Sequence, residues 1–188
     1  EYAPGHGGVA GGFRDSGLLA AFRARGGEVL VLSNVDNLGA CLDPAIVGLH
    51  ARLGRRATVE VAARSPSDKG GMPVLLDGRT VLLEGLRWPP GLDDGAYGFF
   101  NTNTFLIDAE VFRDPPRLDA YPVVKEVSGR KAIQFERILG EITHQVETSF
   151  VLVPATGAGS RFVPVKRRED LETQRPIIEG VLGSWGVL

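Results

Sequence analysis

Short runs of apolar residues alternate with helix-like stripes along the chain, and several of the runs end in a polar loop. Apolar residues recur at helical spacing over residues 18–22, and this stripe stops at Gly26-Gly27. Residues 28–32 form a nearly continuous apolar run, which is typical of a central strand covered on both faces. Asp43-Pro44 predicts a second helix over residues 45–53, because Asp caps helices and Pro fits their first turn.

The rest of the chain continues the alternation and adds one hairpin. Asp77-Gly78 lies between two short apolar runs, which is a strong signal for a tight β-hairpin. We expect strands over residues 58–62, 73–76, 80–83, 105–107 and 149–153, and helices over residues 109–112, 134–144, 168–173 and 177–182. Strands that alternate with helices favour an α/β fold with a mostly parallel sheet and one antiparallel hairpin. Residues 1–188 are interpreted as a single domain.

Composition narrows the class of protein. A hydrophobic content of 43% and a charged content of 23% are normal for a soluble globular protein. The net charge of -2, without any basic stripe, argues against a nucleic-acid partner. No apolar run approaches the roughly 20 residues that span a bilayer. The single cysteine, Cys41, excludes an internal disulfide and fits a reducing compartment, so we expect a cytoplasmic protein. We expect no membrane partner, and an oligomer is possible.

The polar loop after the first predicted strand, Ser33-Asn34-Val35-Asp36-Asn37, is the most informative segment. In open α/β sheets, ligands bind in the loops that follow the carboxyl ends of strands. A carboxylate flanked by carboxamides suits a divalent cation with a phosphorylated substrate, because Mg²⁺ takes one or two protein carboxylates and completes its shell with water and phosphate oxygens. The same residues are also common in ordinary turns, where they bond to their own backbone.

Two further segments offer polar groups for a ligand. His6 lies between Gly5 and Gly7, so its backbone can approach a ligand closely, although a solvated terminus has the same composition. Asn101 and Asn103 are two residues apart and share one face of an extended segment. Their carboxamides can bind sugar hydroxyls, or they can simply end the strand.

Two lysines are candidates for phosphate binding. Lys69 precedes a pair of glycines, and Lys166 follows a rigid extended stretch. A fixed Lys beside phosphates stabilises nucleotidyl transfer, whereas most lysines are solvated surface residues. His50, His144 and Cys41 lack partners at metal-ligand spacing and are interpreted as packing or surface residues.

Five motifs occur in an order that resembles one known family. They are Pro4-Gly5-His6-Gly7, Ser33-Asn34-Val35-Asp36-Asn37-Leu38-Gly39-Ala40, Asp68-Lys69-Gly70-Gly71, Phe100-Asn101-Thr102-Asn103 and Ser160-Arg161-Phe162-Val163-Pro164-Val165-Lys166. Their succession resembles the UTP–glucose-1-phosphate uridylyltransferase (UDP-glucose pyrophosphorylase) family of the eukaryotic-like type. The resemblance extends from Pro4 to about Leu171.

The resemblance implies a Rossmann-like nucleotidyltransferase core with three layers and a Mg²⁺-dependent reaction of UTP with glucose 1-phosphate, giving UDP-glucose and pyrophosphate. It implies Asp36 as the metal ligand and Lys166 as a cation on the phosphates, both catalytic. It also implies that substrates contact the following residues: Gly5, His6, Asn34, Lys69, Gly71, Asn101, Thr102, Asn103 and Glu136.

Several departures from the family pattern keep alternatives open. The family's Gly-rich nucleotide loop and its C-terminal β-helix have no counterpart in these 188 residues, so the chain resembles the latter part of a catalytic core, and we expect it to be inactive alone. Gln134-Phe135-Glu136-Arg137 replaces the usual Gln-Leu-Glu-Thr, and residues 155–159 form a Gly-containing insert. The alternatives are a UDP-N-acetylhexosamine or broad-specificity UDP-sugar pyrophosphorylase, a non-catalytic sugar-nucleotide-binding paralogue, and a chain that pairs with another polypeptide carrying the missing loop.

Overall fold

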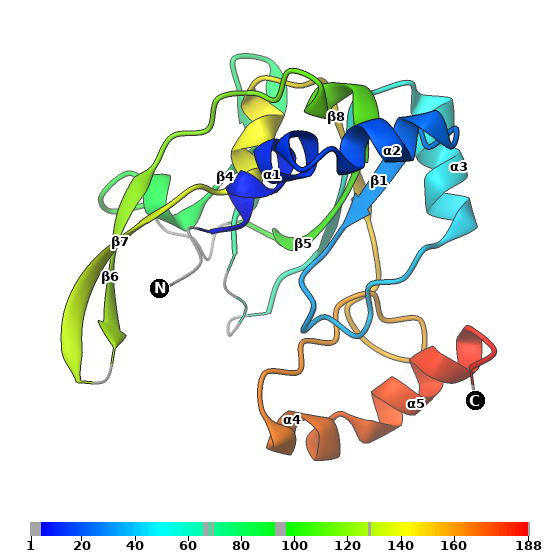
Figure 1. Ribbon diagram of the computed structural model, residues 1–188. Helices are drawn as coiled ribbons and strands as arrows, with labels where there is room; N and C mark the ends of the chain where they lie inside the picture. The colour runs from blue at the N-terminus through cyan, green and yellow to red at the C-terminus, as the bar shows by residue number, and fades with distance from the viewer. Residues whose placement is uncertain (1–4, 66–67, 69, 93–96, 128, 188) are drawn as a thin grey trace.

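A computed structural model describes residues 5–65, 68, 70–92, 97–127 and 129–187 (Figure 1). Its centre is a four-stranded sheet in the order β1-β5-β2-β8. The strands are β1 (Val29–Leu32), β2 (Ala57–Ala63), β5 (Phe99–Asp108) and β8 (Thr148–Leu152). The expected α/β fold class is therefore confirmed.

The sheet is mixed rather than mostly parallel, which corrects the sequence-based expectation. β2 pairs with β8 in parallel, but β5 lies between β1 and β2 and is antiparallel to both. Three strands therefore run in one direction, and one inserted strand makes two of the three pairings antiparallel. The strand expected over residues 105–107 is also longer than predicted, since β5 begins at Phe99 and has ten residues.

Helices cover both faces of this sheet, giving three layers. α1 (Val9–Asp15) and α2 (Leu18–Ala24) pack through Ala10 and Leu19 on the larger apolar core, which includes Val59 and Phe105. On the other face, a smaller cluster around Phe100 is covered from α3 (Pro44–Leu53) and from the segment after β8. α3 begins as expected, because the Asp43 carboxylate accepts a hydrogen bond from the Ala45 amide (2.8 Å).

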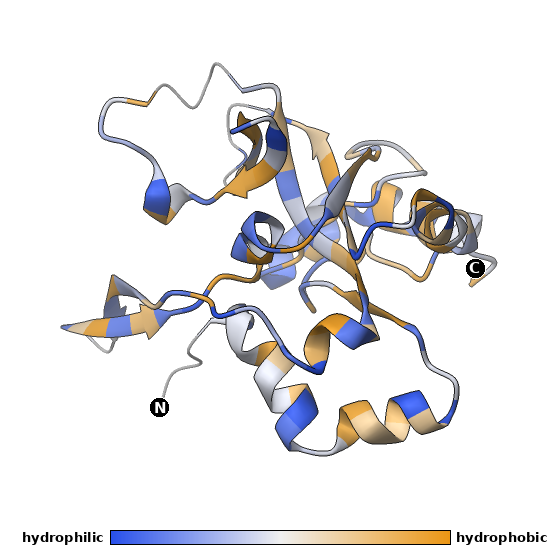
Figure 2. Cartoon of the chain, turned by 90° about the horizontal axis from the view of Figure 1, so that it is seen from above, coloured by the Kyte–Doolittle hydropathy of each residue, from blue (hydrophilic) through white to orange (hydrophobic). Residues whose placement is uncertain are grey.

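Two hairpins project from the layers. The expected hairpin joins β3 (Met72–Leu76) to β4 (Arg79–Leu83). Asp77 and Gly78 both have positive φ, of 49° and 76°, as a type I′ turn requires. The second hairpin, β6 (Tyr121–Val127) with β7 (Arg130–Glu136), is the ribbon at the left of Figure 1, and Figure 2 shows hydrophobic and hydrophilic residues alternating along it.

The helix expected over residues 134–144 is wrong in its first part. Residues up to Glu136 belong to β7, because they pair with β6, and only η5 (Leu139–His144) is helical, as a 3₁₀ helix. The other short helices of the described residues are η1 (His6–Gly8), η2 (Gly85–Arg87), η4 (Ala109–Phe112), α4 (Arg168–Thr173) and α5 (Arg175–Ser184). In the described part of the chain, no helix has the length and apolarity to cross a membrane.

Candidate active site

One cavity of about 190 Å³ collects most of the polar residues that the sequence singled out. It is lined by His6, Asn34, Asp36, Gly70, Gly71, Glu84, Asn101, Thr102, Asn103, Phe162, Pro164 and Lys166. An adjoining cavity of about 270 Å³ shares three of these residues, His6, Asn34 and Asn103, and adds Gly5. Segments separated by up to 160 positions in the sequence therefore meet at one place.

The topology of the sheet explains this convergence. β1 and β2 are both antiparallel to β5, so their carboxyl ends lie at the same edge as the first residues of β5. The loop with Asn34 and Asp36 follows β1, and the Asn101–Asn103 stretch opens β5. The site thus lies at the carboxyl ends of the parallel strands, where open α/β sheets bind ligands.

Asn101 and Asn103 both line the cavity, but the strand between them is not the regular extended segment that the sequence suggested. The register shifts between Glu60 and Val61 of β2, so Thr102 and Asn103 form a bulge, and Asn103 has a positive φ of 61°. The Asn101 carboxamide oxygen accepts a hydrogen bond from the Asn103 amide (2.9 Å). The bulge turns Asn103 toward the loop after β1.

The carboxamides of Asn103 and Asn34 connect β5 to the loop after β1. Asn103 Nδ2 donates to Asn34 Oδ1 at 2.5 Å, which joins the β5 bulge to the loop after β1. Asn34 is exposed and lines both cavities, so it borders the space where a ligand would lie. Thr102 is buried instead, and its hydroxyl donates to the carbonyl oxygen of Glu60 (2.8 Å), which stabilises the bulge.

His6 is held in one orientation at the junction of the two cavities. Its Nδ1 accepts a hydrogen bond from the Leu139 amide (3.0 Å), so the neutral ring carries its proton on Nε2. Burial lowers the pKa of His6, and the nearby Glu136 carboxylate partly opposes this shift. Gly5, with φ of 83°, passes so close to Arg137 that a Cβ would lie 2.6 Å from its carbonyl oxygen.

Asp36 and Lys166 belong to two segments that pair with each other. The backbone amide of Val165 donates to the Asp36 carbonyl oxygen (2.7 Å), and both Asp36 and Lys166 line the cavity. Asp170 holds the start of the next helix by accepting from the amides of Lys166 and Arg167 (2.9 Å each). The site therefore brings the Asp36 carboxylate and the Lys166 ammonium group together with several carboxamides. Among the described residues, no group of three or more His, Cys, Asp and Glu side chains could hold a metal ion alone.

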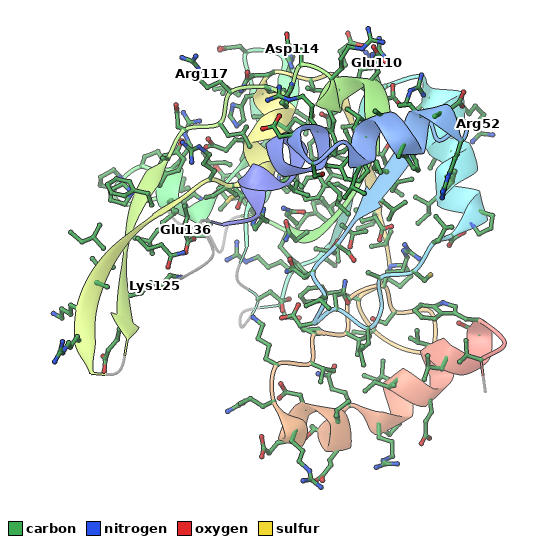
Figure 3. All side chains as sticks on the ribbon, in the orientation of Figure 1. Arg52, Glu110, Asp114, Arg117, Lys125 and Glu136 are labelled. Atoms are coloured by element: carbon green, nitrogen blue, oxygen red, sulfur yellow. The ribbon has the colours of Figure 1, made fainter. Side chains whose placement is uncertain are left out.

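One expected substrate contact, Glu136, lines neither cavity. Glu136 lies at the end of β7, and its carboxylate pairs with Lys125 Nζ at 3.1 Å (Figure 3). It does not line either cavity, because the strand places it on the face of the ribbon that carries Lys125. Lys69 lies outside the described residues.

The family model for UTP–glucose-1-phosphate uridylyltransferase matches residues 1–175 of this chain, which include all of the residues that line the two cavities. The chain belongs to this family. Enzymes of that name from Musa acuminata and Hordeum vulgare are 31% and 32% identical over 182 and 186 residues. These alignments cover 90% of this chain and 38% of each relative, so the chain spans about two fifths of the length of these uridylyltransferases.

Solved structures of the family have the same fold. UDP-glucose phosphorylase from Trypanosoma brucei is 30% identical with a TM-score of 0.76, over 89% of this chain and 40% of that chain. A point mutant of UDP-glucose pyrophosphorylase from Leishmania major, in complex with UDP-glucose, is 28% identical with a TM-score of 0.73, over 90% of this chain and 41% of that chain. The nucleotidyltransferase fold of the uridylyltransferases is therefore present in these residues.

Glu84 is a cavity residue that the sequence reasoning missed. It follows β4, and its carboxylate lies against Gly71 and Gly140, since a Cβ at Gly71 would be 2.6 Å from it and one at Gly140 would collide with it. Asn101 Nδ2 lies 3.5 Å from its Oε1. Burial raises the pKa of Glu84 to about 7, and Glu141 adds to this shift, whereas hydrogen bonds from Asn101 and the Gly71 backbone oppose it. The signal available in the sequence was an acidic residue at the end of an apolar strand, between Leu83 and Gly85.

Glu84→Gln is expected to stabilise the protein above pH 7 and to have a smaller effect at pH 5. The pKa in the folded state is raised from 4.5 to about 7, so the folded protein holds a proton that the unfolded chain releases, and stability falls as the pH rises through this window. Above pH 7 the charged, buried carboxylate costs about 3 kcal/mol, which glutamine removes. Urea unfolding of both proteins at pH 5 and pH 8 measures the difference, and a difference that is equal at both pH values would contradict the raised pKa.

Proposed function

We propose that this chain provides the sugar-binding and metal-binding side of an enzyme that converts UTP and glucose 1-phosphate to UDP-glucose and pyrophosphate. The observation that carries the proposal is the meeting of Asp36 and Lys166, 130 positions apart in the sequence, on one cavity with several sugar-compatible polar groups. A relative with this fold, from Leishmania major, has been solved in complex with UDP-glucose.

The sugar would bind between β5 and the end of β4. Glu84 and Asn101 present a carboxyl and a carboxamide to this part of the cavity, and Gly70 and Gly71 leave room beside them. Hydroxyl groups both donate and accept hydrogen bonds, so they can satisfy these buried polar atoms. With a pKa of about 7, Glu84 exists in both protonation states near neutral pH, so it can accept a hydrogen bond from a sugar hydroxyl or donate one.

The residues present fit a Mg²⁺ ion that shares its ligands with the substrates. Asp36 offers one carboxylate at the cavity, and Mg²⁺ usually takes only one or two protein carboxylates, with water and phosphate oxygens in its other positions. Asp36 would hold the ion, with the Asn34 carboxamide beside it. When bound, Mg²⁺ neutralises phosphate charge and orients the phosphates for in-line displacement.

The chain's own groups would act by positioning and by charge. A phosphate oxygen of glucose 1-phosphate forms a bond to the α-phosphorus of UTP, while the bond from that phosphorus to the bridging oxygen of pyrophosphate breaks. Lys166, which lines the cavity, would stabilise the negative charge on the phosphates. His6 would donate from Nε2 to the sugar phosphate, because its Nδ1 is already an acceptor. This mechanism needs no covalent intermediate with the protein.

The proposed partners are UTP, glucose 1-phosphate, UDP-glucose and pyrophosphate, without nucleic acid. We also propose a cytoplasmic location, because the lone Cys41 forms no disulfide and needs no oxidising compartment.

A panel of sugar 1-phosphates tests the proposed function in the full-length protein. Each sugar is incubated with UTP and Mg²⁺, and pyrophosphate release is measured. We expect the highest kcat/KM with glucose 1-phosphate. Higher kcat/KM with N-acetylglucosamine 1-phosphate would favour an N-acetylhexosamine enzyme, and release with none of the sugars would favour a binding paralogue, so either outcome would contradict the proposal.

A further inference from the structure

The loop that carries Asp36 and the segment that carries Lys166 lie side by side as a short antiparallel pair. Leu38 N donates to the Val163 carbonyl oxygen (3.0 Å), and Val165 N donates to the Asp36 carbonyl oxygen (2.7 Å). Asn37 forms an antiparallel bridge with Pro164 between these two bonds. The relative position of the two proposed catalytic side chains is therefore set by this pairing.

The side chain of Asn37 reinforces the pairing. It is 5% exposed, and its Nδ2 donates to the Arg161 carbonyl oxygen (3.0 Å). Its Oδ1 accepts from the amides of Val163 (2.8 Å) and Gly39 (3.1 Å). One amide group thus bonds to both segments, and only a side chain with a donor and an acceptor at this reach satisfies all three backbone groups.

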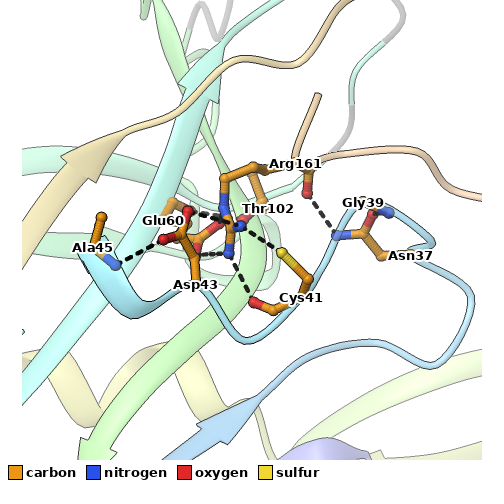
Figure 4. A network of polar contacts seen from close by, with 8 residues as sticks. All are labelled: Asn37, Gly39, Cys41, Asp43, Ala45, Glu60, Thr102 and Arg161. Atoms are coloured by element: carbon orange, nitrogen blue, oxygen red, sulfur yellow. Dashed lines mark hydrogen bonds and ion pairs between the residues drawn. The ribbon is translucent and has the colours of Figure 1, made fainter. Parts of the chain in front are cut away.

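The segment that Asn37 holds is itself fixed to the central sheet. The Arg161 guanidinium makes a two-pronged ion pair with Glu60 of β2, with Nη2 at 2.5 Å from Oε1 and Nε at 2.8 Å from Oε2. It also donates to the carbonyl oxygen of Cys41 (3.1 Å), and Figure 4 shows the arginine side chain between Glu60 and Cys41. Asn37 therefore ties the Asp36 loop to an element that is anchored in the core.

The backbone of the Asp36 loop also lies very close to the backbone of the segment that carries Lys166. A Cβ at Gly39 would lie 2.5 Å from the carbonyl carbon of Arg161, so glycine is required for the loop to reach the segment. Pro164 has no amide hydrogen and offers no donor at the bridge. Asn37 and Pro164 form a non-hydrogen-bonded pair, so no backbone bond is lost at the proline, and the Asn37 side chain adds bonds to Arg161 and Val163 beside the two backbone bonds.

We propose that Asn37 is a positioning residue that fixes the separation between Asp36 and Lys166 across the cavity. Asn37 does not line the cavity, so it acts through its neighbours rather than by contact with substrate. The proposal rests on the proposed function, since the importance of the separation follows from the roles given to Asp36 and Lys166. Small displacements of catalytic groups are known to lower rates by about 100-fold.

Asn37→Ala in the full-length protein tests the proposal. We expect kcat to fall by about 10- to 100-fold, with a much smaller change in the KM for glucose 1-phosphate, because the sugar pocket formed by β4 and β5 is left intact. Asn37→Asp keeps the size and the two accepted bonds but loses the donor to Arg161, and it should lower kcat in the same direction. This second variant keeps the test valid if the alanine variant folds poorly.

Thr58→Val is the matched control. Thr58 is fully buried, and its Oγ1 lies 2.8 Å from His50 Nδ1 at the end of β2 opposite to the cavity, so this variant also loses a buried hydrogen bond. We expect it to lower the melting temperature without changing kcat. A kcat of Asn37→Ala within about twofold of the wild type, or an equal loss of kcat in the control at equal loss of melting temperature, would overturn the proposal.

Amide hydrogen exchange separates this proposal from the proposed function. The amides of Leu38, Val163 and Val165 should exchange faster in Asn37→Ala than in the wild type, whether or not the protein turns over these substrates. If the wild type has no uridylyltransferase activity, the proposed function fails, but faster exchange in Asn37→Ala still shows that the Asn37 side chain holds the two segments together. Unchanged exchange at all three amides would contradict the proposal that the Asn37 side chain holds the two segments together.

Discussion

Asp36→Asn is expected to lower the kcat of the full-length protein by about 100- to 1,000-fold, the largest effect of any single change in the cavity. Asparagine has nearly the same shape, so the backbone bond from Val165 to residue 36 and the pairing of the two segments remain. What is lost is the one negative charge that Asp36 brings to the proposed metal position. A charge-bearing ligand that acts mainly in the transition state affects kcat more than substrate affinity.

Pyrophosphate release at several Mg²⁺ concentrations measures this effect. The variant should also need a higher Mg²⁺ concentration for half-maximal activity, because a neutral carboxamide binds the ion less tightly than a carboxylate. Asp15→Asn is the control, since Asp15 is an exposed carboxylate at the end of α1 that pairs with Arg14. Near-normal kcat and an unchanged Mg²⁺ requirement in Asp36→Asn would refute the assignment of Asp36 to the metal.

Arg161→Met is expected to be the most destabilising substitution in the segment after β8, with a loss of about 3–5 kcal/mol. Glu60 is fully buried in β2, and Arg161 supplies its two-pronged partner (Figure 4). Removal of the guanidinium leaves a buried carboxylate without its cation, which costs more than the net contribution of the pair. Urea unfolding of the variant and the wild type measures the loss.

The double variant Glu60→Gln with Arg161→Met tests whether the unpaired charge of Glu60 causes the loss of stability. Because the buried negative charge is gone, we expect the double variant to recover a substantial part of the stability that Arg161→Met loses. Glu60→Gln alone should be less destabilising than Arg161→Met. If the double variant is as unstable as the sum of the two single variants, the ion pair does not account for the stabilisation.

The elements that the sequence predicted well have strong local determinants. The strand over Val29–Leu32 is an apolar run with a polar loop after it, and α3 has its Asp43 cap and its Pro at the first turn. The β3–β4 hairpin depends on Asp77-Gly78, whose positive φ values only a few residue types adopt readily. In each case, the local chemistry and the tertiary structure favour the same conformation.

The elements that were missed depend on long-range pairing. β7 contains Gln134, Phe135 and Glu136, which also fit a helical pattern, and it becomes a strand only because β6 pairs with it. The insertion of β5 between β1 and β2 likewise has no local signal, since strand order is a property of the whole chain. η5 likewise packs against β4, where the Thr143 hydroxyl accepts a hydrogen bond from the Leu82 amide, a contact that no local pattern indicates.

The candidate site also contains some residues that the sequence could identify and others that depend on long-range contacts. Asp36, Lys166 and the residues opening β5 came from motifs whose order resembles a family, and the fold brings them to one cavity. Asn103 lies there because of a β-bulge, and Glu84 because two glycines allow its carboxylate to be buried. Neither feature can be derived from spacing, because each depends on contacts between segments far apart in the chain.

A structure of the full-length protein with UDP-glucose and Mg²⁺ tests the central claim most directly. We predict that the hexose lies against Glu84 and Asn101, that a metal ion is bound by Asp36, and that Lys166 Nζ is within hydrogen-bond distance of a phosphate oxygen. UDP-glucose bound in a different cavity, or bound in this one with Asp36 and Lys166 both distant from the phosphates, would contradict the account.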